Sequence, residues 1–434
     1  MMSDPIAEYM RRTRRSAEMY EDSKRVVPGG VTHSARHFEP YPLFVKSASG
    51  AHFTDADGND YVDCWCGHGA HIFGHSYPPV IAEVKKQIET ATHYGMPHEL
   101  EAALARQVVK MVPNVEMVRF PNTGTEATMY ATRLARGYSG RARIGKFAGG
   151  WHGGYDALHL AVKPPLDAPA SNGLPGGATS DTAVLPYNDI EGVERIMKKE
   201  KLGAVIIEPV LGAGGAIAVE REFLKGLRNL CTENDAVLIF DEVITGFRLA
   251  PGGAQEYFGV PADLVCFGKI LGGGFPIGGI AGPREVMSCI DFTQLKGGKA
   301  VYQGGTFCGN PISMTAGLTT LKLLEDGAVL RRLNETTAKM KKDITDIFSR
   351  HNIDVQPSGA GSTFCTHFSN KPVRNIHDAL AADTKTLKLY HMHLLNHDVF
   401  NLPAHQGFLS AVHSEQDIAQ IINATEGFAK RIPS

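Results

Sequence analysis

Between about residues 76 and 310, helical patterns alternate with short apolar runs rich in valine, isoleucine and phenylalanine. This alternation predicts an α/β domain with a parallel sheet covered by helices on both faces, because parallel strands must be joined by crossover connections. The runs expected to form strands are Met117 to Phe120, Ile144 to Phe147, Ala204 to Ile207, Ala236 to Phe240 and Leu264 to Phe267.

The two ends of the chain have a different character. Residues 1–75 begin with a polar helix, pass through Pro28-Gly29-Gly30 and reach two short strand-like pieces, which predicts an arm and a hairpin. Residues 311–434 begin with a long helical stretch and continue into a mixed region, which predicts a linking helix and a small α+β domain. Residues 163–181 are rich in proline and glycine, and we expect a lid over a site there.

Charge and cysteine content exclude several classes of protein. The chain has 44 basic and 46 acidic residues, so it carries no electrostatic footprint for nucleic acid or an anionic membrane. No apolar window is long enough to span a bilayer. The seven cysteines are an odd set that lies mostly in apolar runs, which favours reduced thiols in a cytoplasmic protein.

Charged residues follow two of the apolar runs. Asp241 follows Phe240, and Lys269 comes soon after Phe267. Ligands bind at the carboxyl ends of parallel strands, and a buried carboxylate or lysine is costly without a reason. The two residues therefore form either a structural ion pair or a site in which Lys269 is an amine nucleophile.

A turn of small residues follows another predicted strand. The segment 121–127, Pro-Asn-Thr-Gly-Thr-Glu-Ala, opens a helix whose free amides and dipole would bind a phosphate. Thr123 and Glu126 also fit a plain capping box. Together with Lys269 and Asp241, a phosphate cradle suggests pyridoxal phosphate, bonded to the lysine as an imine and held protonated at its ring nitrogen by the aspartate.

These motifs resemble those of the class III (fold type I) pyridoxal-phosphate aminotransferases over nearly the whole chain. Within that class, the glutamate-1-semialdehyde 2,1-aminomutase group is the most similar. The segments that carry the resemblance are 27–31, 122–127, 150–153, 186–189, Glu208-Pro209, 241–248, the Lys269 segment, Gly305-Thr306 and 309–311.

The resemblance implies a large domain with a mostly parallel seven-stranded sheet, a small α+β domain from the two chain ends, and a homodimer with shared sites. It also implies roles for the cofactor-binding residues, which include Glu208. Gly124 and Thr125 would bind the phosphate, Asp241 the ring nitrogen, Val243 and Trp151 the two ring faces, and Thr306 the phosphate in the neighbouring subunit. Lys269 would form the Schiff base and carry protons, while His152 would support Trp151 or the lid, or assist proton transfer.

The residues expected to bind substrate depart from the mutase pattern. Arg36 matches an arginine that binds the substrate carboxylate, but His68 stands where the mutases have tryptophan, and Gln406 replaces a charged residue. Near the cofactor hydroxyl, where the family uses an Asn or Gln just after Glu-Pro, Leu211 and Ala213 cannot donate a hydrogen bond. We therefore expect an aminotransferase that moves an amino group, with β- and ω-amino groups included, between small-molecule donors and acceptors, with the aminomutase as the alternative.

The segment 64–75 contains two cysteines and three histidines that could be assembled into a zinc site. Their spacing matches no usual zinc pattern, so we expect no metal. A metal-dependent hydrolase and a catalytically silent binding protein are the remaining alternatives.

Overall fold

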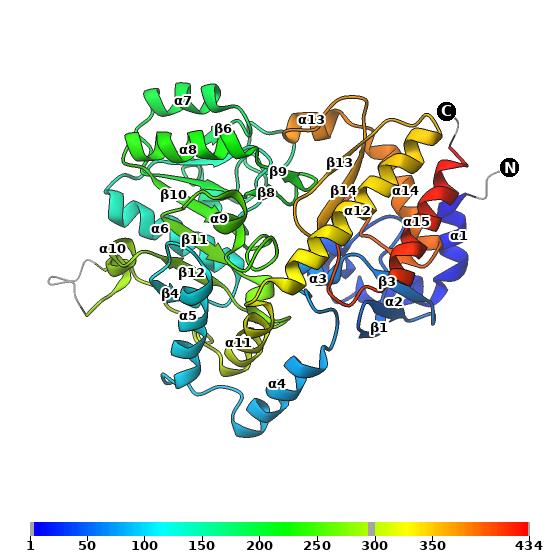
Figure 1. Cartoon of the computed structure of the whole chain (residues 1–434), viewed down its shortest axis with the longest axis horizontal. Coiled ribbons are helices and arrows are strands. Elements are labelled where there is room, and N and C mark those ends of the chain that lie inside the picture. The colour runs from blue at the N-terminus through cyan, green and yellow to red at the C-terminus, as the bar shows by residue number, and fades with distance from the viewer. Residues whose placement is uncertain (1–3, 294–299, 433–434) are drawn as a thin grey trace. The chain divides into compact units, whose positions relative to one another are not determined.

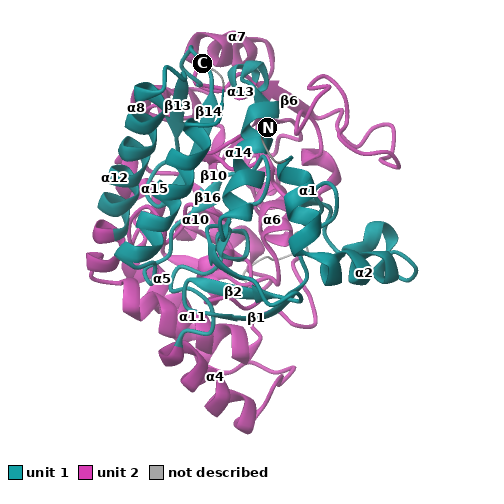
Figure 2. Ribbon diagram, turned by 90° about the vertical axis from the view of Figure 1, so that its right-hand side faces the viewer, with its two compact units in different colours: residues 1–77, 333–373, 377–434 teal, residues 78–332, 374–376 magenta. Residues whose placement is uncertain are grey.

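The computed structural model describes residues 4–293 and 300–432 (Figure 1). The chain forms two compact units: residues 78–332 with 374–376, and residues 1–77, 333–373 and 377–434 (Figure 2). The sequence predicts boundaries after residues 75 and 310. The later boundary is observed after residue 332 because helix α11 (Pro311–Leu324) packs against α4 (Pro78–Thr90) and α5 (Glu99–Met111) of the larger unit.

A seven-stranded sheet forms the centre of the larger unit, in the order β4-β12-β11-β10-β7-β5-β6. Strand β12 runs antiparallel to both of its neighbours, and the other pairs are parallel. The mostly parallel α/β sheet predicted from the sequence is thus confirmed. The strands are β4 (Met117–Arg119), β5 (Ile144–Phe147), β6 (Thr182–Leu185), β7 (Ala204–Ile207), β10 (Val237–Asp241), β11 (Leu264–Phe267) and β12 (Gly279–Gly282).

Helix α6 (Gly124–Ser139) packs on one face of this sheet, over β7, β10, β11 and β12. Its small side chains Ala127 and Ala131 lie in a core cluster with Ile206, Ile239 and Cys266 of the strands. Helix α8 (Arg221–Glu233) packs on β10, and α7 (Ile190–Lys199) packs on β6. The remaining elements of this unit are η3 (Asp156–Leu158), α7 (Ile190–Lys199), β8 (Val210–Leu211), β9 (Ile217–Ala218), α8 (Arg221–Glu233), α9 (Gly253–Phe258), η4 (Lys269–Gly272), α10 (Arg284–Met287) and η5 (Ser288–Ile290).

The smaller unit is built from both chain ends, as expected. Its four-stranded sheet has the order β1-β2-β3-β15, so a strand from the C-terminal part pairs with the N-terminal hairpin, and a three-stranded sheet has the order β13-β14-β16. Helix α12 (Ala328–Arg350) begins in the larger unit and ends in the smaller one, while α13 (Ile376–Ala381) has its first residue in the larger unit. The other elements are α1 (Pro5–Arg12), α2 (Arg14–Ser23), η1 (Pro28–Gly30), η2 (Ser34–Arg36), β1 (Val45–Ser49), β2 (His52–Asp55), β3 (Asp60–Asp63), α3 (Cys66–Gly69), β13 (Val355–Ser358), β14 (Thr363–Phe368), α14 (Thr384–Asn396), β15 (Val399–Phe400), β16 (Gly407–Phe408) and α15 (Glu415–Ala429).

Residues 163–181, the expected lid, contain no helix and no strand. Within the described residues, none of the helices combines the length and the apolar character needed to cross a membrane.

Candidate active site

A cavity of about 220 Å³ lies in the larger unit, where several strands of the parallel part of the sheet end. Eight side chains or glycines that we expected at a cofactor site line it together. These are Gly124, Thr125, Trp151, His152, Glu208, Asp241, Val243 and Lys269. The structure thus brings together residues that come from five separate segments of the chain.

The N-terminus of α6 forms one wall of the cavity. Thr123 is the N-cap, and its hydroxyl accepts a hydrogen bond of 3.1 Å from the amide of Glu126. The first helical residue is Gly124, where a Cβ atom would lie 2.9 Å from Cγ1 of Val243. Glycine therefore lets the helix terminus, with its free amides, come close to the turn after β10. An anion of phosphate size suits such a terminus.

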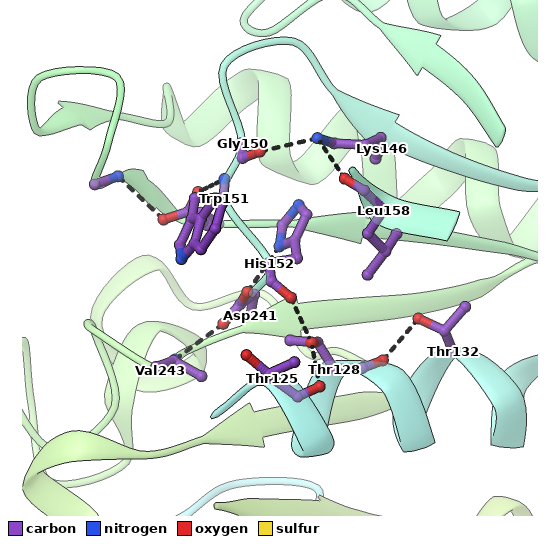
Figure 3. Close-up of polar contacts among 12 residues, drawn as sticks. Thr125, Thr128, Thr132, Lys146, Gly150, Trp151, His152, Leu158, Asp241 and Val243 are labelled. Carbon is purple, nitrogen blue, oxygen red and sulfur yellow. Dashed lines mark hydrogen bonds and ion pairs between the residues drawn. The ribbon is translucent and has the colours of Figure 1, made fainter. Parts of the chain in front are cut away.

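Asp241 and His152 form a buried pair beside this wall (Figure 3). Oδ2 of Asp241 lies 2.7 Å from Nδ1 of His152, and Oδ1 accepts a hydrogen bond of 3.1 Å from the amide of Val243. Burial lowers the pKa of His152, so the neutral ring donates its Nδ1–H to the carboxylate. This pairing orients the Asp241 carboxylate at the cavity wall, and the sequence did not predict it.

Glu208 holds the backbone of two loops at the cavity. One of its oxygens accepts a hydrogen bond of 2.7 Å from the amide of Trp151, and the other accepts one of 3.1 Å from the amide of Gly212. Burial, together with the nearby Asp241 carboxylate, raises the pKa of Glu208 to about 8. The side chain of Trp151 exposes 41% of its surface, so its indole face is available for stacking.

Lys269 follows β11 and lines the same cavity. Burial lowers the pKa of its amine, and the carboxylates of Asp241 and Glu208 act in the opposite direction. In the described part of the chain, the carboxylate of Asp241 accepts its hydrogen bond from the neutral ring of His152, and no ion pair joins it to Lys269. A desolvated amine of this kind can act as a nucleophile and as a proton carrier.

These groups fit pyridoxal phosphate by the chemistry of their donors. A helix N-terminus suits the phosphate, a lysine amine suits the aldehyde, and an oriented carboxylate suits a protonated ring nitrogen. Val243 and Trp151 supply an aliphatic and an aromatic surface in the same cavity.

Thr306 lies apart from this cavity. It is exposed and lines a second cavity of about 230 Å³ with His93, Tyr94 and Met96.

The three expected substrate residues all belong to the smaller unit. Arg36 is exposed, and its guanidinium donates a hydrogen bond of 3.2 Å to the hydroxyl of Thr32. The ring of His68 lies near those of Trp65 and His33, with centroids 4.5 and 5.0 Å apart. Gln406 is buried, and its Oε1 accepts no hydrogen bond from any described residue.

The cysteine and histidine segment takes part in ordinary packing and pairing. Cys64 and Cys66 are buried, and Nε2 of His75 lies 2.7 Å from Oδ2 of Asp63. Among the described residues, no group of three or more His, Cys, Asp or Glu side chains is placed to hold a metal ion.

Several other residues that line the cavity were not predicted from the sequence as site residues, among them Thr128 and Gly153. The hydroxyl of Thr128 donates a hydrogen bond of 2.7 Å to the carbonyl of His152. At Gly153, φ is +79° and a Cβ atom would lie 2.2 Å from Oγ1 of Thr125. The Gly-Gly pair at 153–154 was the available signal for this close approach.

Comparison with known proteins gives one family. The profile of the family described as Aminotransferase class-III matches residues 33–396. A glutamate-1-semialdehyde 2,1-aminomutase from Methanothrix thermoacetophila is 42% identical over 420 residues, which cover 96% of each chain.

The solved structures include aminotransferases with other substrates. An ω-transaminase from Sphaerobacter thermophilus has a TM-score of 0.91 and 34% identity, covering 96% of this chain and 97% of its own. A β-phenylalanine aminotransferase from Variovorax paradoxus has a TM-score of 0.89 and 30% identity, covering 98% of this chain and 96% of its own. A transaminase solved with pyridoxal phosphate bound has a TM-score of 0.89 and 31% identity, covering 96% of this chain and 98% of its own.

Proposed function

The chain belongs to the class III aminotransferase family and is a pyridoxal-phosphate-dependent enzyme, and on that premise we propose that it transfers an amino group between two separate small molecules. The donor is a small amino acid or amino-aldehyde that carries a β- or ω-amino group. The acceptor is a keto acid or aldehyde that enters after the first product has left.

The residues of the cavity divide the work of this reaction. Pyridoxal phosphate, when bound, would supply an electron-poor ring as an acceptor for the electron pair of the substrate carbon. Lys269 Nζ would hold the cofactor through its aldehyde carbon, and the free amine would take the proton from the substrate carbon. Asp241, oriented by His152, would keep the proton on the ring nitrogen, while Gly124 and Thr125 at the start of α6 would bind the phosphate.

The observation that carries the choice of aminotransferase is the pair of substituted substrate residues. His68 stands where the mutase group has tryptophan, and Gln406 stands where related groups carry a charged residue. An enzyme that returns the amine to the same molecule must keep the reaction intermediate in its active site. At these two positions the chain lacks the residues that the mutases use to bind their own substrate.

The second candidate is the intramolecular transfer catalysed by glutamate-1-semialdehyde 2,1-aminomutase. It is favoured by the 42% identity to a protein of that name over 96% of this chain. A mutase would keep the reacting molecule in the cavity and return the amine to the adjacent carbon.

One experiment separates the two candidates. The enzyme is converted to its pyridoxamine form and incubated with glutamate-1-semialdehyde, and separately with a panel of keto acids, without a second amino donor. We expect a keto acid to consume the pyridoxamine form and yield its amino acid. Isomerised product from glutamate-1-semialdehyde alone would replace the aminotransferase with the mutase.

A homodimer with shared active sites is part of the proposal. Thr306 is exposed and shares a cavity with Met96, which exposes 72% of its surface, and Tyr94, which exposes 41%. Phe307 also exposes 57% of its surface. Exposed apolar side chains gathered in this way are typical of an interface, so Thr306 would reach the cofactor phosphate of the second copy. The seven free cysteines support a cytoplasmic location.

A further inference from the structure

A second buried lysine of the larger unit has no part in the mechanism above. Lys146 lies in the middle of β5, its residue is fully buried, and strands β6 and β7 flank it on the two sides. Its ammonium donates hydrogen bonds to the carbonyl oxygens of Gly150, at 2.9 Å, and Leu158, at 3.1 Å (Figure 3). It donates a third to the carbonyl oxygen of Leu160. Three acceptors match the three donors of a charged lysine, whereas a neutral amine has only two.

A fully buried ammonium is costly, since burial lowers the pKa of Lys146 to about 7. An apolar side chain of similar length would fill the same space without that cost. The three carbonyls would then lose their donor, so what the lysine contributes is the conformation of the backbone that carries them.

That backbone forms the loop 149–161, which presents two residues to the cofactor cavity. The amide of Gly149 closes the loop by donating a hydrogen bond of 2.7 Å to the carbonyl of Ala161. Trp151 and His152 directly follow the carbonyl of Gly150 that Lys146 binds, and both line the cavity. On the cavity side, Glu208 holds the amide of Trp151 and Asp241 holds the ring of His152.

The loop is therefore held by the carboxyl groups of Glu208 and Asp241, which line the cavity, and by Lys146, which does not. Lys146 is not among the residues that line the cavity, so it cannot serve as a second attachment point for the cofactor. Its effect on the site must pass through the loop.

We propose that Lys146 is a positioning residue, whose three hydrogen bonds hold the loop 149–161 so that Trp151 and His152 meet the cofactor in the correct place. The proposal rests on the cofactor-binding role given to the cavity above. It adds a residue outside the cavity on which cofactor affinity depends.

The test compares Lys146→Met, which keeps the length of the side chain and removes its donors, with Lys198→Met as the control. Lys198 is an exposed lysine of α7 that pairs with Glu194 at 2.7 Å. Amide hydrogen exchange is measured by mass spectrometry on the cofactor-free proteins, and pyridoxal phosphate is then titrated into each.

In Lys146→Met we expect amide exchange in peptides covering residues 149–161 to accelerate about tenfold, while exchange in β10 and α8 stays unchanged. We also expect the affinity for pyridoxal phosphate to fall on the order of tenfold to a hundredfold. Lys198→Met should match the parent in both. A purely structural role for Lys146 would accelerate exchange across the whole larger unit. The proposal would be overturned by accelerated exchange across the whole unit. It would equally be overturned by unchanged exchange of the loop or by unchanged cofactor affinity.

Lys146→Gln provides a second variant if the methionine variant does not fold, because its amide keeps two donors. We expect it to lose cofactor affinity about threefold or more, and an affinity equal to that of the parent would then decide against the proposal. Both readouts are independent of substrate, so a failed aminotransferase assay leaves this inference standing. A parent protein that bound no pyridoxal phosphate would instead overturn the proposed function.

Discussion

Two lysines of the larger unit show how surroundings set the use of one residue type. Both have a pKa lowered by burial. Lys146 is surrounded by carbonyl oxygens that use every donor of its ammonium, so the amine is bound to protein. Lys269 lines the cavity beside Asp241 and Glu208, where its amine can meet a ligand. Only the second has the access that a nucleophile needs.

The first prediction concerns Lys269. The parent protein should be yellow, and borohydride should attach the cofactor irreversibly to Lys269. Lys269→Ala should be colourless in the same preparation and should lose several orders of magnitude in kcat, because it removes the attachment point and the proton carrier together. Absorbance spectroscopy and peptide mapping after reduction check this. Lys225→Ala, at an exposed lysine of α8 paired with Glu222, is the control. Yellow colour that persists in Lys269→Ala would contradict the assignment.

The second prediction uses the buried Glu242, whose pKa burial raises to about 7. The folded state then binds more protons than the unfolded state between about pH 4.5 and 7, so this group lowers the free energy of unfolding as pH rises through that window. Glu242→Gln should therefore become more stable relative to the parent, by about 3 kcal/mol across the window. Denaturant titration of both cofactor-free proteins at several pH values measures the difference. A difference that does not change with pH would refute the prediction.

At the scale of elements, the start of α6 affects both the stability of the fold and the proposed binding of the cofactor phosphate. Alanine favours a helix over glycine by about 1 kcal/mol at an ordinary position. At Gly124 the added Cβ would lie 2.9 Å from Cγ1 of Val243, a distance that requires the helix or the strand-end turn to move. The cost of overpacking, about 1–3 kcal/mol, is therefore expected to exceed the helical gain.

The third prediction follows from that contact. Gly124→Ala should destabilise the cofactor-free protein by about 1 kcal/mol or more and weaken the binding of pyridoxal phosphate. Val243→Ala should remove the clash, so the double variant should recover stability relative to the sum of the two single changes. Thermal unfolding of the four proteins gives this coupling directly. Simple additivity would show that the two residues do not meet.

At the scale of the whole molecule, the residues around Thr306 are exposed in a single chain. Met96, Tyr94 and Phe307 leave large parts of their apolar surface uncovered. This is the surface that we assign to a second copy of the chain.

The fourth prediction tests that assignment. Met96→Glu places a charge on the exposed apolar surface and should convert a dimer into a monomer of 46.9 kDa. Cofactor affinity should fall as well, because Thr306 would no longer reach the site of the second copy. Analytical ultracentrifugation and cofactor titration measure the two effects. Val26→Glu, which changes an 82% exposed residue of the smaller unit, serves as the control. A parent that sediments as a monomer would contradict the shared sites.

The sequence by itself determined the α/β sheet and pointed to eight of the residues that line the cavity. Strands buried on both faces must be apolar throughout, so the runs ending at Phe240 and Phe267 were visible, and with them Asp241 and Lys269 just beyond. Strands β6 and β12 were not predicted. The segment Gly279–Gly282 of β12 contains two glycines, which weaken any local strand pattern.

The tertiary structure alone decided how the site is held together. His152 and Asp241 are 89 residues apart in the chain, yet their side chains meet, and the role of Lys146 depends on carbonyl groups of a loop whose shape no local pattern specifies. The membership of α11 in the larger unit likewise depends on its packing against α4 and α5. Periodicity and turn chemistry indicate the secondary structure that each segment forms by itself. The contacts that hold the site together depend instead on which distant segments become neighbours when the core is buried.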